Sequence, residues 1–115
     1  PQRSGFVNFR QMEAEAAKIL KRLELDVSPA IPVKDLSIAS RQMVEIGRAL
    51  LMQPKLLILD EPTSSLSQDD ADYLHEIIKK LKAEGTSIIY VSHRLEDVMY
   101  ICDRIAVLKD GVVSG

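Results

Sequence analysis

The chain has 115 residues, which is enough for one compact domain or a piece of one and too few for two. Apolar residues make up 46% and charged residues 28%, a balance typical of a folded globular protein and not of a disordered tail. The formal net charge is −2 with both signs interspersed, and there is no tryptophan, so we expect no nucleic-acid partner.

The N-terminal part of the chain predicts a loop followed by a helix. Residues 2–8 are expected to form the loop; Asn8 then offers a helix cap, and Gln11 three residues later completes a capping box. Apolar residues at helical spacing predict an amphipathic helix over residues 9–23. Residues 28–32, Ser-Pro-Ala-Ile-Pro, break this pattern because proline lacks the backbone donor that a helix needs.

A second helix and a first strand are expected next. The helix is predicted over residues 37–51, and Pro54 prevents its continuation. The segment 55–59 carries four consecutive apolar residues. A run that is apolar on both faces is typical of a strand inside a covered parallel sheet.

The chain then predicts another helix and another strand. Ser67 is expected to cap the helix, and Gly85 is expected to end it. His75 lies between apolar positions of this helix, and we expect it to be exposed. Residues 87–91 are expected to form the second apolar strand.

The C-terminal residues continue the alternation. Residues 95–102 predict a short helix whose apolar face includes Cys102, which we expect in the core. Residues 105–108 predict a third strand, and Asp110-Gly111 between apolar runs predicts a hairpin. The order strand, helix, strand, helix, strand predicts an α/β fold with a parallel sheet.

Two adjacent acids, Asp60 and Glu61, come directly after the first strand. In open α/β sheets, ligands bind at the carboxyl ends of the strands. One carboxylate there is enough for Mg²⁺, which keeps several waters and binds phosphate oxygens. A neighbouring glutamate can polarise an attacking water. The alternative is that the two acids only begin a turn before Pro62.

Three sequence blocks occur in a fixed order along the chain. They are Leu-Ser-Ile-Ala-Ser at 36–40, Leu-Leu-Ile-Leu-Asp-Glu-Pro-Thr-Ser-Ser-Leu at 56–66, and Ile-Tyr-Val-Ser-His-Arg at 89–94. In this order and spacing, they resemble the ATP-binding cassette (ABC) ATPases over residues 36–111. The resemblance implies a partial P-loop NTPase domain, with a parallel sheet, flanking helices and part of the helical subdomain.

The resemblance also implies roles for single residues. Asp60 would bind Mg²⁺ and ATP, Glu61 would be the catalytic glutamate, and His93 would be the catalytic switch histidine that senses the γ-phosphate. A lone histidine after an apolar strand is more often structural than catalytic, but its place relative to the two acids favours the catalytic reading.

Further ATP contacts are implied in two segments. Ser64 and Ser65 match the loop that couples two nucleotide sites. The signature segment would close over the ATP of an opposing cassette, so the implied partner is a second cassette placed head to tail. Its residues are Ser37, Ile38, Ala39 and Ser40. A helix start suits a phosphate because its N–H groups are unpaired, and a capping role of its serine is compatible with this.

Several positions depart from the usual pattern of the family. Ile38 and Ala39 replace the two glycines of the usual Leu-Ser-Gly-Gly-Gln signature, and Ser67 replaces an aspartate common in the coupling loop. Substituted signatures followed by Gln-Met-Val-Glu-Ile, as at residues 42–46, are similar to the first cassette of bacterial monosaccharide importer subunits. This resemblance implies sugar import.

The phosphate-binding motif Gly-x-x-x-x-Gly-Lys-Ser/Thr cannot be built from the five glycines of the chain. We therefore expect a C-terminal fragment of a cassette, with residues 1–53 in the helical subdomain and residues 54–115 in the nucleotide-binding core. Alone, it is expected neither to bind ATP tightly nor to hydrolyse it. Exposed sheet edges are expected to favour self-association.

The leading hypothesis is an ATPase subunit of an ABC transporter that imports a solute together with transmembrane permease subunits. No apolar run approaches the roughly 20 residues needed to cross a bilayer, and no signal peptide is visible. We therefore expect a cytoplasmic protein, peripheral on the inner face of the cell membrane. Two alternatives stay open: a non-transport ABC ATPase of DNA maintenance or translation, and a non-catalytic assembly module.

Overall fold

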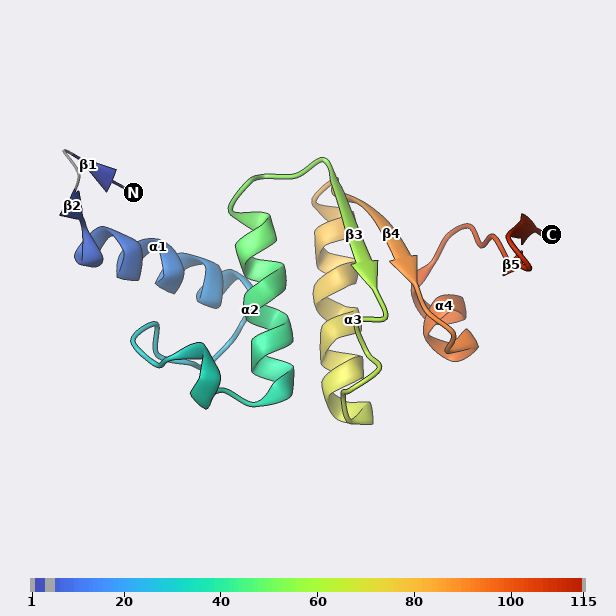
Figure 1. The fold of residues 1–115 in the computed structure, drawn as a ribbon, viewed down its shortest axis with the longest axis horizontal. Helices are drawn as coiled ribbons and strands as arrows, with labels where there is room; N and C mark the ends of the chain where they lie inside the picture. Colours follow the sequence, from blue (N-terminus) through green and yellow to red (C-terminus); the bar gives the residue numbers. More distant parts are fainter. Residues whose placement is uncertain (1, 4–5, 115) are drawn as a thin grey trace.

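Two groups of elements lie next to each other along the long axis of the chain (Figure 1). The computed structural model describes residues 2–3 and 6–114, and the chain measures 53 × 29 × 27 Å. The first group holds the helices α1 (Phe9–Arg22) and α2 (Ile38–Leu50). The second group holds β3 (Leu56–Asp60), α3 (Gln68–Ala83), β4 (Ser87–Val91) and α4 (Leu95–Ile101).

The N-terminal segment forms a strand pair, although the sequence predicted a loop over residues 2–8. Strand β1 (Gln2–Arg3) runs antiparallel to β2 (Phe6–Val7). The loop prediction was wrong for these four residues, and its residues 4 and 5 lie outside the described part of the chain. Strands of two residues are too short to show the alternation by which a strand is recognised in a sequence.

Helix α1 begins at the predicted cap. The Asn8 side chain accepts a hydrogen bond from the Gln11 backbone N–H at 3.2 Å. The other half of the predicted capping box does not form, because the Gln11 side-chain amide donates to Glu15 at 3.3 Å instead. The helix is thus capped by a single side-chain contact.

Helix α2 packs closely against the C-terminal end of α1. A Cβ atom placed on Gly47 would lie 2.6 Å from Ile19 Cγ2 and 3.0 Å from Leu23 Cδ1. The glycine therefore allows an approach that a larger residue would prevent. A 3₁₀ turn, η1 (Val33–Asp35), precedes α2, and the helix prediction over residues 37–51 is confirmed with its two end residues as caps.

Strands β3 and β4 form a parallel sheet. They pair over five residues each, from Leu56 opposite Ser87 to Asp60 opposite Val91. Both strands were predicted, and α3 connects them. Alternate residues of β3 enter a core shared with α2 and α3. The core residues of these elements are Met43, Ile46, Leu50, Leu57, Leu59, Leu74, Ile77, Ile78 and Leu81.

The predicted ends of α3 are confirmed. Ser67 accepts a hydrogen bond from the Asp70 backbone N–H at 3.2 Å. Gly85 follows the C-cap residue Glu84 with a φ of 97°, a left-handed conformation that glycine adopts without strain.

Helix α4 buries only part of the apolar face that was predicted, with Val98 and Cys102 half-buried. The buried residues are Asp97 and Ile101, whereas Leu95 and Met99 are exposed. Cys102 is half-buried at the edge of the core. The spacing of apolar residues did not indicate that an aspartate would occupy the inner face. Of the helices between residues 6 and 114, none combines the length and apolarity needed to cross a bilayer.

The third strand of the parallel sheet was predicted over residues 105–108, and this prediction was wrong. Residues 105–107 are not a strand, and β5 (Leu108–Lys109) pairs only with β6 (Val112–Val113) in the described part of the chain. A parallel strand forms only where its backbone can hydrogen-bond to a neighbouring strand, and the apolar run alone does not indicate which strand that would be. The hairpin is confirmed: Asp110 and Gly111 have φ values of 51° and 76°, as a tight two-residue turn requires.

His75 is buried, although the sequence predicted an exposed side chain. Only 2% of its surface is accessible, and its Nε2 atom lies 3.2 Å from the Tyr90 hydroxyl. The residue shares a helix face with Ala71 and Ile78, which are also buried, and this face meets the sheet and α4. Burial lowers the pKa of His75 from its ordinary value of 6.5, and the carboxylate of Asp97 opposes this shift.

One face of the sheet is uncovered by the described residues. Its side chains Leu56, Ile58, Ile89 and Val91 are each between 46% and 61% exposed. A groove of about 930 Å³ runs beside β4 and is lined in part by residues 103–108. A contiguous apolar surface of this kind favours association with another surface.

We predict that the chain loses stability as the pH falls below the ordinary pKa of 6.5 for histidine. The unfolded imidazole takes up a proton before the buried one does, so acidification stabilises the unfolded state. The variant His75→Gln, which has no imidazole to titrate, should lose this component. Urea unfolding at about pH 7.5 and about pH 5.5 measures it. An equal pH dependence in both proteins would contradict the prediction.

We also predict that the isolated chain self-associates through the uncovered sheet face. Sedimentation velocity at rising concentration should show larger species, and the double variant Ile58→Lys/Ile89→Lys should shift them toward monomer, because charges on an apolar face oppose its burial. Ile31→Lys, an exposed isoleucine away from the sheet, is the matched control. A wild-type chain that remains monomeric at high concentration would refute this.

Candidate active site

Asp60 and Glu61 lie where β3 leaves the sheet. The Glu61 backbone N–H donates to the carbonyl of Val91, the last residue of β4, at 2.8 Å. Glu61 has a φ of 48°, a left-handed conformation that is uncommon outside glycine and turns the chain sharply. The Ser64 N–H then donates back to the Glu61 carbonyl at 3.2 Å, so the turn is fixed on both sides of the acid.

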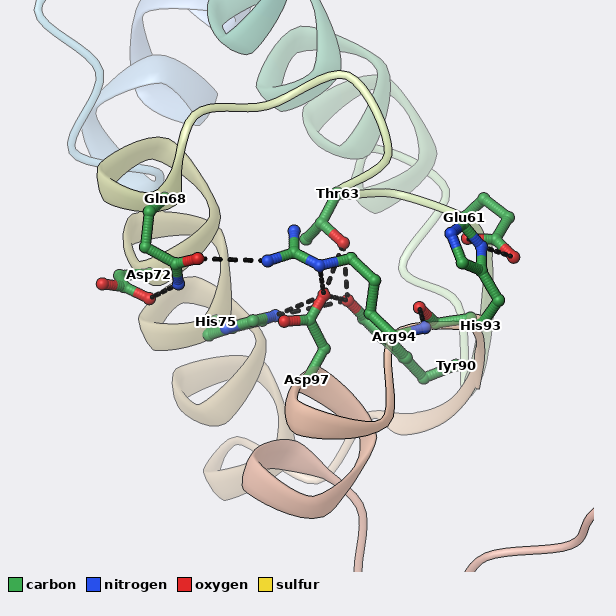
Figure 2. Close-up of polar contacts among 10 residues, drawn as sticks. Glu61, Thr63, Gln68, Asp72, His75, Tyr90, His93, Arg94 and Asp97 are labelled. Carbon is green, nitrogen blue, oxygen red and sulfur yellow. Dashed lines mark hydrogen bonds and ion pairs between the residues drawn. The ribbon is translucent and has the colours of Figure 1, made fainter.

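Glu61 and His93 face each other across the ends of the two strands (Figure 2). His93 Nδ1 lies 3.0 Å from each oxygen of the Glu61 carboxylate. The His93 side chain is 75% exposed and that of Glu61 is 35% exposed, so a reactant can reach both. A carboxylate beside an imidazole can polarise a water molecule and exchange a hydrogen bond with a phosphate. We call these two residues the Glu61–His93 pair.

Asp60 supplies a further carboxylate at the same edge of the sheet. Its side chain is exposed at the last position of β3. Among the described residues, no group of three or more His, Cys, Asp or Glu side chains is arranged to hold a metal. One carboxylate beside a second acid fits Mg²⁺, which completes its shell with water and phosphate oxygens, better than it fits a metal enclosed by protein.

Ser64 and Ser65 are exposed in the turn that follows Glu61. The turn continues to Leu66, whose N–H donates to the Thr63 carbonyl at 3.1 Å. The two serine side chains therefore project from a short, hydrogen-bonded segment next to the Glu61–His93 pair.

The signature segment lies on the other group of elements, at the start of α2. Ser37 Oγ accepts the Ser40 backbone N–H at 3.1 Å and donates to Ser40 Oγ at 3.0 Å. Ile38 is 59% exposed, and Ala39 is half-buried. Within the described residues, no hydrogen bond joins this segment to the Glu61–His93 pair. The structure thus brings together the residues that follow the strands and leaves the signature segment apart from them.

Sequence reasoning missed a polar cluster beside the pair, in which Thr63, His75 and Asp97 are buried and the other two residues are half-buried. We call its residues the Asp97 cluster: Thr63, His75, Tyr90, Arg94 and Asp97. Thr63 Oγ1 donates to Asp97 Oδ2 at 2.6 Å, and Arg94 Nε lies 3.6 Å from the same oxygen. The Tyr90 hydroxyl lies 3.5 Å from this oxygen, so several elements meet at one carboxylate (Figure 2).

The only sequence signal for this cluster was weak. Asp97 stands four residues after His93, but an acid in the first turn of a helix is ordinarily explained by the helix dipole. In the structure Asp97 is 3% exposed and Thr63 is 1% exposed. Buried polar groups are stable only when hydrogen-bonded, and this cluster satisfies them mutually.

Comparison with known proteins identifies the family of this chain. The sequence model described as "ABC transporter" matches residues 1–64. The "Arabinose import ATP-binding protein AraG 2" of Burkholderia cenocepacia (strain HI2424) is 50% identical over 111 residues, which cover 96% of this chain and 22% of that protein. The "Galactose/methyl galactoside import ATP-binding protein MglA 2" of Photobacterium profundum is 41% identical over 112 residues, with coverages of 97% and 22%. The chain thus spans 22% of the length of these curated relatives.

Solved structures of ABC cassettes have a similar fold. An ATP-binding cassette of an ABC transporter, MJ1267, is 31% identical with a TM-score of 0.84, over 98% of this chain and 45% of that one. The dimeric bacterial ABC transporter cassette MJ0796 is 28% identical with a TM-score of 0.78, over 98% and 49%. The predicted fold class, a partial P-loop NTPase domain of the ABC type, is confirmed. This chain belongs to the ABC transporter family.

Proposed function

We propose that this chain is part of a cassette that binds and hydrolyses ATP and so drives the import of a sugar across a membrane. The observation that carries the proposal is the Glu61–His93 contact of 3.0 Å beside the exposed carboxylate of Asp60. Relatives that cover nearly the whole chain are named as arabinose and galactose import ATP-binding proteins. Residues 1–53 belong to the helical subdomain in this proposal, and residues 54–115 to the nucleotide-binding core.

Asp60, Glu61 and His93, the three residues at the strand ends, have separate roles in ATP hydrolysis. Asp60 holds Mg²⁺, which when bound neutralises charge on the phosphates. Glu61 accepts a proton from the attacking water, a role worth about 10²–10⁴-fold in rate. His93, which shares its Nδ1 contact between both oxygens of that carboxylate, keeps the glutamate oriented and offers its other ring nitrogen to the γ-phosphate.

The two serine-rich segments serve ATP held between two cassettes. The start of α2 presents the N–H groups of Ile38 and Ala39 to the γ-phosphate of a partner cassette, and the Ser37 hydroxyl exchanges its contact with Ser40 Oγ for that phosphate. Ile38, Ala39 and Ser40 form the rest of this contact. Ser64 and Ser65, which are exposed beside Glu61, connect the two nucleotide sites. The similar structure MJ0796, which is named as a dimeric cassette, supports the pairing of two cassettes.

The cassette works at the cytoplasmic face of a membrane, against permease subunits that cross it. The names of the relatives describe import, and import by an ATP-binding subunit requires a separate pathway for the solute. Hydrolysis at Glu61 reopens the two cassettes and moves the permease between its states.

We predict that the 115-residue chain alone does not turn over ATP, because its sequence contains no loop to cradle the β- and γ-phosphates. Release of inorganic phosphate from ATP and Mg²⁺ is the measurement. Turnover by the isolated chain that disappears in Glu61→Gln would contradict this prediction.

In a protein that joins this chain to a phosphate-binding loop, we predict that Glu61→Gln slows hydrolysis by about 10²–10⁴-fold, because the amide cannot accept the proton. ATP binding should persist, since the substitution removes no phosphate contact. Glu13→Gln, the same change on the exposed surface of α1, is the matched control and should keep full activity. Normal turnover in Glu61→Gln would refute the proposed role.

A further inference from the structure

A single carboxylate oxygen joins the two loops that carry the Glu61–His93 pair. Asp97 Oδ2 accepts the Thr63 hydroxyl at 2.6 Å, and Thr63 follows Glu61 by two residues. Arg94 directly follows His93, and its Nε lies 3.6 Å from the same oxygen. The loop after β3 and the loop after β4 therefore share one buried anchor (Figure 2).

The contact between Glu61 and His93 is not sufficient to fix its own geometry. Ion pairs between exposed side chains are worth little, because water screens them and ordering the side chains costs entropy. The His93 side chain is 75% exposed. The Thr63–Asp97 hydrogen bond, by contrast, lies where both side chains are at most 3% exposed and involves a charge, so it is among the stronger contacts of the chain.

The anchor is itself held from several directions. Arg94 donates from Nη2 to Gln68 Oε1 on α3 at 3.1 Å, and its backbone N–H donates to Ser92 Oγ at 3.0 Å. The Tyr90 hydroxyl on β4 lies 3.5 Å from Asp97 Oδ2. These contacts tie the position of Asp97 to α3, β4 and α4 together.

We propose that Thr63 and Asp97 are positioning residues for hydrolysis, which hold Glu61 and His93 at the distance that the reaction needs. They touch neither the nucleotide nor the water, and they act through the backbone of the two loops. Small displacements of reacting groups cost large factors in rate, so loss of the anchor slows the chemical step more than it weakens ATP binding. This inference rests on the proposed function for its kinetic consequence, and on geometry alone for its structural one.

The test compares Thr63→Val, which removes the hydroxyl and keeps the shape, with Thr63→Ser, which keeps the hydroxyl. Amide hydrogen exchange in the 115-residue chain should become about tenfold faster at Glu61, Ser64 and Arg94 in Thr63→Val and stay unchanged in Thr63→Ser. The matched control is Tyr73→Phe, which removes a hydroxyl that donates to the carbonyl of Leu23, the C-cap residue of α1. It should leave these three amides unchanged.

In the ATP-hydrolysing protein, Thr63→Val should lower kcat by about tenfold and change KM by less than about twofold, and Thr63→Ser should restore kcat. If Thr63→Val does not fold, Asp97→Asn takes its place, with the same readouts and Tyr73→Phe as the control. Unchanged exchange at the loop amides, or a kcat that falls equally in Tyr73→Phe, would overturn the proposal. If the protein that joins the unsubstituted chain to a phosphate-binding loop shows no ATP turnover, the proposed function fails and the exchange measurement alone decides the positioning role.

Discussion

The parallel pairing of β3 with β4 is the constraint on which the rest of the structure depends. Its register places Asp60 opposite Val91, so that both strands end at one edge and the loops that follow them start side by side. A shift by one residue would turn Leu57 and Leu59 out of the core, because alternate side chains of a strand point to opposite faces. Burial of these two leucines against α2 and α3 therefore also fixes where Glu61 begins its turn.

Exposed and buried polar groups have different roles at the edge of the sheet where β3 and β4 end. Glu61 and His93 stay open to solvent, as groups that meet a nucleotide and water must, and an exposed contact has little strength of its own. Thr63, His75 and Asp97 of the Asp97 cluster are buried beside them, where low accessibility strengthens each hydrogen bond and makes an unpaired group costly. The exposed Glu61–His93 pair is thus held in place by the Asp97 cluster, whose buried polar groups must stay hydrogen-bonded.

Prediction from the sequence succeeded where the signal was local. The caps Asn8, Ser37 and Ser67 and the hairpin at residues 110–111 depend on neighbours three residues away or fewer, and all of them formed. The prediction of a parallel strand over residues 105–108 was wrong, because an apolar run does not indicate which strand will pair with it. The contact between Glu61 and His93, by comparison, followed from two strong strand patterns whose carboxyl ends meet in a parallel sheet.

By itself the sequence determined the type and approximate bounds of the main helices and strands, and the family to which its three blocks belong, because these depend on residue spacing along the chain. Tertiary structure alone decided which polar side chains became buried. His75 and Asp97 look like surface residues in their own helices, and both are interior because α3 and α4 turn those faces toward β4. Burial depends on what a helix face meets, and that partner lies far away in the sequence.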